Sequence, residues 1–109
     1  MTLSIALTSL PDQESAKTLS QSLLESRLAA CVSMIPGVQS TYWWEGRLEQ
    51  SAEVLLLIKF PQALLSQLES HLLRVHPYDV PEFVVLPSTY ASAAYEGWAH
   101  SVCTGTLQK

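Results

Sequence analysis

The alternation of hydrophobic and polar residues at the start of the chain predicts a strand. Over residues 2–8, Leu3, Ile5 and Leu7 point one way and the residues between them point the other. This pattern is typical of a strand with one face on a core.

A helix is expected to start within residues 9–12 and to end near Ser26 or Arg27. Pro11 suits a first helical turn, and the carboxylate of Asp12 complements the positive end of the helix dipole. Apolar residues at helical spacing predict its buried side: Ala16, Leu19, Leu23 and Leu24.

Residues 31–60 have the pattern of one β-hairpin, with arms longer than the usual strand of about 5–6 residues. Glu45-Gly46 is suited to a two-residue turn, because glycine adopts a positive φ angle readily. Pro36-Gly37 interrupts the first arm, and a bulge or bend is expected there. The turn predicts three cross-strand pairs: Trp44 with Arg47, Trp43 with Leu48, and Tyr42 with Glu49.

The second arm contains an uninterrupted apolar run over residues 54–58, which implies cover on both faces. Leaving one face in water would forgo about 1.5–3 kcal/mol for each large side chain, and several such losses rival the stability of a small domain. The rest of a 109-residue chain is too small to cover this hairpin. We therefore expect other copies of the chain to cover it, and a ligand site to lie where the copies meet.

The second half of the chain predicts a helix, a short strand and a last helix. Pro61 opens the first of these helices, which ends before His76-Pro77 because the residue preceding proline is disfavoured in the helical region. Its buried side is expected to consist of Leu64, Leu65, Leu68, Leu72 and Leu73. A loop is expected at residues 77–82 and a strand at residues 83–86. The last helix is expected at residues 91–102, and the tail from Gly105 onward is expected to be frayed.

The predicted order is strand, helix, strand, strand, helix, strand and final helix, in a single domain over residues 1–109. This is the α+β, ferredoxin-like βαββαβ pattern. Two features extend it here, a long hairpin between the second and third strands and a C-terminal helix.

Composition narrows the classes of function. Charged residues make up 15% of the chain, which is below the typical quarter and indicates that part of the surface is hidden in an assembly. The net charge is -4 without a basic cluster, which argues against nucleic acid and anionic membranes as partners. No apolar run approaches the roughly 20 residues of a membrane span, and no basic segment marks a signal peptide, so a cytoplasmic location is expected. Cys31 and Cys103 form no CxxC motif and are expected to be buried thiols.

Four motifs occur in order along the chain: Ala29-Ala30-Cys31-Val32, Ile35-Pro36-Gly37-Val38, Tyr42-Trp43-Trp44-Glu45-Gly46 and His76-Pro77-Tyr78-Asp79-Val80-Pro81-Glu82. Together they resemble the CutA family of divalent-cation tolerance proteins, from about Leu3 to Trp98. The resemblance implies a small cytoplasmic homotrimer of ferredoxin-like subunits, whose long hairpins interlock around a threefold axis. It also implies a structural similarity to PII signalling proteins, a link to tolerance of copper and other divalent metals, and no firmly attached enzymatic reaction.

The resemblance points to copper ligands that this chain retains only in part. Members reported to hold copper have a cysteine near the end of the first strand and two adjacent histidines before Pro-Tyr. Those places are occupied here by Thr8, Val75 and His76. Of these ligands, only His76 is present.

Metal ligation is the first hypothesis for a site. Within one chain, His100 and Cys103 lie three apart on a helix and supply only two of the roughly four ligands of a closed site. A copper or zinc site shared by three chains needs fewer ligands from each, and its candidates are His76 and Cys31. For the pair within one chain, the alternative is that His100 is a surface histidine and Cys103 a buried thiol. The full set of soft or borderline ligands is Cys31, Cys103, His71, His76 and His100.

An interchain cleft is the second hypothesis. The hairpin tip of one chain is expected to reach the loop of its neighbour, where a lysine, a carboxylate and aromatic walls would form a pocket for a small anion or a metal ligand. The alternative is that the aromatic residues anchor an interface and that Lys59 and Glu82 form an ion pair. The predicted cleft residues are Trp43, Trp44, Glu45, Lys59, Tyr78 and Glu82.

No catalytic residues are predicted, because the chain lacks a GxSxG motif, a glycine-rich phosphate loop and paired carboxylates. Cys31 is expected to be packed in a strand rather than paired with His76 as a nucleophile. The sequence favours a metal-binding homotrimer that acts in divalent-metal tolerance without turnover. The alternative is a PII-like signalling or scaffold trimer that binds a small anion or a partner. The tight turn at Glu45-Gly46 argues against this alternative, because a PII protein is expected to have a long flexible loop there.

Overall fold

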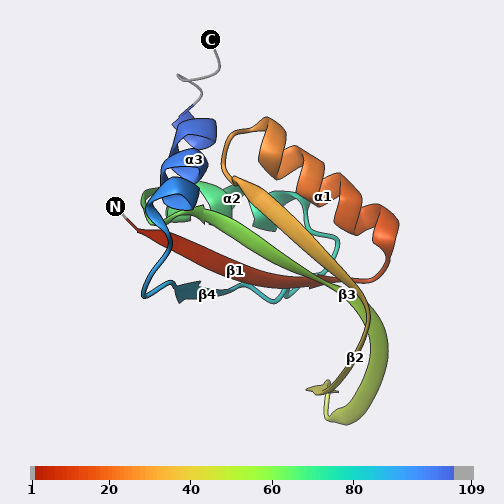
Figure 1. The fold of residues 1–109 in the computed structure, drawn as a ribbon. Coiled ribbons are helices and arrows are strands. Elements are labelled where there is room, and N and C mark those ends of the chain that lie inside the picture. The colour runs from red at the N-terminus through yellow and green to blue at the C-terminus, as the bar shows by residue number, and fades with distance from the viewer. Residues whose placement is uncertain (1, 105–109) are drawn as a thin grey trace.

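The computed structural model describes residues 2–104 and confirms the predicted order of elements (Figure 1). The predicted fraying from Gly105 onward lies outside the described residues. The strands are β1 (Leu3–Leu10), β2 (Cys31–Trp44), β3 (Arg47–Pro61) and β4 (Val84–Pro87). The helices are α1 (Gln13–Glu25), α2 (Leu65–Val75) and α3 (Ala93–Thr104), and a 3-10 turn, η1 (Gln62–Leu64), precedes α2.

The four strands form one antiparallel sheet in the order β2-β3-β1-β4. Helices α1 and α2 pack against one face of this sheet, where their leucines share a core with alternate residues of β1 and β3 (Figure 1). Helix α3 covers only one end of the sheet, through a small cluster of Leu3, Ala30 and Ala99. The fold is therefore the expected α+β, ferredoxin-like arrangement with an additional C-terminal helix.

The β2–β3 hairpin extends beyond the body of the domain and curves at its end (Figure 1), and the chain measures 50 × 26 × 24 Å. The predicted turn is confirmed, with positive φ angles of 52° at Glu45 and 77° at Gly46. The three predicted cross-strand pairs next to the turn are confirmed as well. A register shift between Ile35 and Val38 confirms the irregularity expected at Pro36-Gly37.

The ends of the early elements differ from the expectation. Strand β1 continues to Leu10, and α1 begins at Gln13 because Asp12 serves as its N-cap. The Asp12 carboxylate accepts a hydrogen bond of 2.8 Å from the Ser15 backbone N–H, which satisfies one of the free donors of the first turn. The helix ends at Glu25 with Ser26 as C-cap, as expected.

Two leucines assigned to buried helix faces are exposed. Leu24 of α1 is 40% exposed and Leu73 of α2 is 45% exposed. Each lies next to a fully buried leucine, Leu23 or Leu72, and is thereby turned about 100° away from the sheet. Pro61 ends β3 instead of opening the second helix, because the turn η1 intervenes.

The face of the sheet opposite α1 and α2 remains largely uncovered in the single chain. On β3, Val54, Leu56 and Ile58 are buried against the helices, whereas Leu55 and Leu57 between them are only partly buried. The cover that the apolar run requires on its second face is therefore incomplete within one chain. Within residues 2–104, no helix is long and apolar enough to cross a membrane.

Candidate functional site

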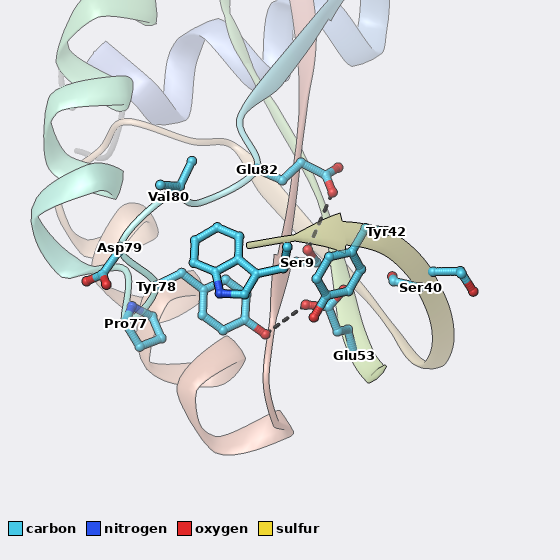
Figure 2. A pocket seen from close by; sticks show the side chains of 11 residues that line it. Ser9, Ser40, Tyr42, Glu53, Pro77, Tyr78, Asp79, Val80 and Glu82 are labelled. Carbon is cyan, nitrogen blue, oxygen red and sulfur yellow. Dashed lines mark hydrogen bonds between the residues drawn. The ribbon is translucent and has the colours of Figure 1, made fainter. Parts of the chain in front are cut away.

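A cavity of about 730 Å³ lies between the outer part of the β2–β3 hairpin and the loop that follows α2 (Figure 2). Strand β1 contributes one residue at its end. The lining consists of Ser9, Ser40, Thr41, Tyr42, Trp44, Glu53, Pro77, Tyr78, Asp79, Val80 and Glu82. The cavity thus joins three segments that are far apart in sequence.

The loop is anchored by the imidazole of His76, which ends α2 as its C-cap. The Nε2–H group donates a hydrogen bond of 2.9 Å to the Ser9 carbonyl oxygen, and Nδ1 accepts one of 3.1 Å from the Tyr78 backbone N–H. These partners require the neutral tautomer protonated at Nε2. Burial lowers the pKa of His76 below its ordinary value of 6.5, and the Ser9 carbonyl and the Glu53 carboxylate oppose this shift.

Glu53 is the most enclosed acidic group of the cavity, with only 8% of its surface exposed. Its carboxylate accepts a hydrogen bond of 2.7 Å from the Tyr78 hydroxyl, drawn as a dashed line in Figure 2. Burial and this contact with Glu53 raise the pKa of Tyr78 well above its ordinary value. Tyr78 therefore stays uncharged and acts as a hydrogen-bond donor.

The lining is acidic. Among the residues that the structure describes, it contains the carboxylates of Glu53, Asp79 and Glu82 and no lysine, arginine or histidine. Glu82 also accepts a long hydrogen bond of 3.4 Å from the Ser9 hydroxyl (Figure 2). The potential inside such a cavity is negative, and it favours a positively charged occupant.

The pairing of the outer hairpin, beyond the register shift, determines which aromatic residues face Glu53. Ile35 pairs with Leu55, whereas Val38 pairs with Glu53, so β2 has one extra residue across this interval. Even-numbered residues of the outer part of β2 consequently share a face with Glu53. These include Ser40, Tyr42 and Trp44, which line the cavity, whereas Trp43 does not line it and is 72% exposed.

Three of the six residues predicted for the cleft lie together at this cavity: Trp44, Tyr78 and Glu82. Trp43, Glu45 and Lys59 do not line it. The Lys59 ammonium instead donates to the Ser33 hydroxyl and lies 3.9 Å from the Cys31 thiol. Any convergence of these groups between chains stays a prediction.

The sequence reasoning missed Glu53 as a site residue. The sequence feature that could have identified Glu53 is its position directly before the apolar run of β3, on the strand that pairs with the Pro36-Gly37 irregularity. A carboxylate at a buried strand position is uncommon unless it is paired. Asp79 and Tyr42 were noted in motifs, but nothing local to either residue showed that both line one cavity.

The predicted metal ligands are not gathered within one chain. Both nitrogens of His76 are engaged in hydrogen bonds, and Cys31 contacts Lys59 and the Tyr95 hydroxyl. Across residues 2–104, no group of three or more His, Cys, Asp or Glu side chains is placed to hold a metal ion. Thr8, which stands where the family's copper ligand was expected, is fully buried.

His71, His100 and Cys103 also lie apart from the cavity. His71 joins α1 to α2 by a hydrogen bond with the Ser22 hydroxyl. Cys103 lies on α3 and is partly buried, and this burial raises the pKa of its thiol. The His100 Nε2 atom is buried and has no hydrogen-bond partner within the described part of the chain.

The model of the family described as "CutA1 divalent ion tolerance protein" matches residues 4–102. The "Divalent-cation tolerance protein CutA" of Pectobacterium atrosepticum is 45% identical over 97 residues, which cover 89% of this chain and 88% of the relative. "Protein CutA 1, chloroplastic" of Oryza sativa is 40% identical over 86% of this chain, which spans 53% of that longer relative.

The fold is also similar to solved structures. The "Divalent cation tolerance protein (Cut A1)" of Thermus thermophilus superposes with a TM-score of 0.86 at 37% identity. The similarity covers 89% of this chain and 94% of that protein.

Proposed function

Since the chain belongs to the CutA1 divalent ion tolerance protein family, we propose that it acts in divalent-metal tolerance as a homotrimer that binds copper or a similar ion without turnover. We place this action in the cytoplasm, although the rice relative is named chloroplastic. Two parts of the proposal can be tested separately, the assembly and the metal.

The uncovered apolar face of the sheet carries the proposal of an assembly. Leu55 and Leu57 alternate with buried residues of β3, and their cross-strand neighbours on β1, β2 and β4 extend the same face. Several of these neighbours are substantially exposed in the single chain: Ile35, Val84 and Leu86. A contiguous apolar surface of this kind is a mark of a protein interface.

The metal ligands would have to come from more than one copy. Cys31 lies on the face opposite α1 and α2, because it pairs with Lys59 on β3, and the Tyr95 hydroxyl of α3 contacts it there. Copies that meet through this face would bring their Cys31 thiols toward one another. His76 would serve as a ligand only after giving up one of its two hydrogen bonds.

Sedimentation velocity and native mass spectrometry with added Cu(II) test the two parts. We expect a trimer at micromolar concentration and at least one retained copper ion per trimer. Cys31→Ser should abolish retention, whereas Cys103→Ser on α3 is the matched control and should not. A stable monomer contradicts the assembly, and a trimer without retained metal contradicts the binding role.

A PII-like trimer that senses a small ligand is the second candidate, and the cavity beside Tyr78 favours it. The carboxylates of the lining argue against a small anion as that ligand. A thermal-shift screen of metals, nucleotides and small anions distinguishes the two functions. A ligand present at 100 times its Kd should stabilise the protein by about 2.7 kcal/mol.

A further inference from the structure

We propose that the cavity between the hairpin and the loop after α2 binds a small organic ammonium ion, either a substituted primary amine or a quaternary ammonium group. This proposal does not depend on the metal-binding role, because it rests on different residues. Glu53 lies on the same face of β3 as Leu55 and Leu57, which we propose to be the interface, so the proposal requires that the cavity stay open in the assembled protein. The buried carboxylate of Glu53, the acidic character of the described lining and the aromatic walls carry it.

Glu53 is a buried acidic group that needs a cationic partner. Its one recorded hydrogen bond comes from the neutral Tyr78 hydroxyl, and no ion pair to it is recorded among residues 2–104. A buried charge is unfavourable unless it is paired, so an enclosed carboxylate beside an open cavity is a place for a cation to bind. Tyr78 leaves the second oxygen of the carboxylate available, because it donates to Oε2 alone.

Two further carboxylates strengthen the preference of the cavity for a cation. Asp79 and Glu82 are exposed residues of the same loop, and both line the cavity (Figure 2). Behind the lining, both ring nitrogens of His76 are engaged, by the Ser9 carbonyl oxygen and by the Tyr78 backbone N–H. The residues described around the cavity therefore supply no positive charge to attract an anion.

Aromatic side chains supply the rest of the recognition. Tyr42 and Trp44 come from the hairpin, and Tyr78 comes from the loop, so aromatic groups lie on two sides of the space. The negative faces of such rings attract ammonium groups, and tryptophan does so most strongly. Aromatic walls combined with a carboxylate are the chemistry that recognises an alkylated amine.

A bare metal ion fits this cavity poorly. Hard divalent cations require six or more oxygen ligands at short distances, and transition metals require about four convergent ligands. The described part of the chain offers no cluster of three suitable side chains. A volume of about 730 Å³ instead suits a small molecule.

Isothermal titration of the assembled protein with choline tests the proposal. The uncharged isostere 3,3-dimethylbutan-1-ol has nearly the same shape, so the comparison isolates the charge. We expect choline to bind at least about tenfold more tightly than the alcohol, as is typical of a charge paired in a desolvated site. Equal affinity for the two compounds, or no measurable binding of choline at about 10 mM, the upper range for weak ligands, overturns the proposal.

Two variants assign the binding to the cavity. Glu53→Gln keeps the shape and the acceptor for Tyr78 but removes the charge, and it should weaken choline binding at least about tenfold. Glu14→Gln makes the same change of charge on the surface of α1 and should leave the affinity unchanged. An equal affinity for choline in Glu53→Gln and the parent protein overturns the assignment.

A second variant keeps the proposal testable if Glu53→Gln fails to fold. Trp44 lies on the exposed hairpin, so Trp44→Leu should fold normally and should weaken choline binding at least about threefold. Unchanged choline affinity in Trp44→Leu overturns the proposal. Saturable binding of Zn(II) that depends on Glu53, without any uptake of choline, would assign the cavity to a metal and overturn it too.

Discussion

The hydroxyl of Tyr78 donates a 2.7 Å hydrogen bond to the carboxylate of Glu53, which connects the loop after α2 to the middle of β3. The same loop is held at its start by His76, which bonds to the end of β1. Two polar contacts therefore hold the loop in position, one at its start and one at Tyr78.

Tyr78→Phe should destabilise the protein by about 1–3 kcal/mol, because the buried Glu53 carboxylate loses its hydroxyl donor. Denaturant unfolding at a fixed protein concentration measures this change in free energy. Tyr90→Phe is the matched control, since Tyr90 is 83% exposed and should tolerate the loss of its hydroxyl. An identical stability of Tyr78→Phe and the parent would show that the contact contributes nothing.

His76 should make the stability depend on pH. Its pKa in the folded protein is lowered below the ordinary value of 6.5, so the unfolded chain takes up a proton more readily than the folded one. The free energy of unfolding should therefore be highest above about pH 6.5 and should fall as the pH drops below that value. Urea titrations at several pH values between about 7.5 and 5 measure the slope.

His76→Gln should reduce that slope. A smaller part should remain, because burial and Arg74 also lower the pKa of His71. The hypothesis fails if the slope of His76→Gln equals that of the parent protein.

Leu57→Lys should dissociate the assembly. Leu57 lies on the uncovered face of β3, and a lysine there would remove the roughly 1.5–3 kcal/mol that each copy gains by burying the leucine. Sedimentation velocity should show monomers with unchanged circular dichroism. Leu73→Lys on the exposed side of α2 is the control and should remain assembled. An assembled Leu57→Lys protein would place the interface elsewhere.

Two glycine substitutions should have opposite effects. Gly46→Ala should destabilise the hairpin by about 1 kcal/mol, because the residue has a φ angle of 77°. Gly97→Ala should stabilise α3 by about 0.5–1 kcal/mol, since the added Cβ would meet no atom within 4 Å apart from its chain neighbours and the backbone of its own helix. Thermal unfolding of both variants measures the difference, and a shift in the same direction for both would contradict the argument.

The order of elements and the hairpin register were predictable because they depend on local signals. Alternating residues define β1, the Glu45-Gly46 turn fixes the pairing next to it, and Pro36-Gly37 marks the register shift. Element ends were less predictable. The 3-10 turn after Pro61 depends on how the chain leaves the sheet, which no short sequence pattern specifies.

The site was predictable only in part, since it depends on contacts between distant segments. The motifs identified Trp44, Tyr78 and Glu82 as site residues, and all three line the cavity. Glu53 was missed because its importance comes from Tyr78, which lies 25 residues later in the sequence. Lys59 was grouped with Glu82 on composition, whereas its side chain turns toward Ser33 on the neighbouring strand.

The extra residue of β2 between Ile35 and Val38 separates two parts of the hairpin whose pairing is set independently. The turn at Glu45-Gly46 sets the pairing of the distal part, and the strands of the domain body set the pairing of the proximal part. The surplus residue absorbs the one-residue difference between them. Deleting it should therefore straighten the ribbon locally and leave the Trp44 indole on the face of Glu53, so this point of the chain tolerates a change of length without a change of the side chains that face the carboxylate.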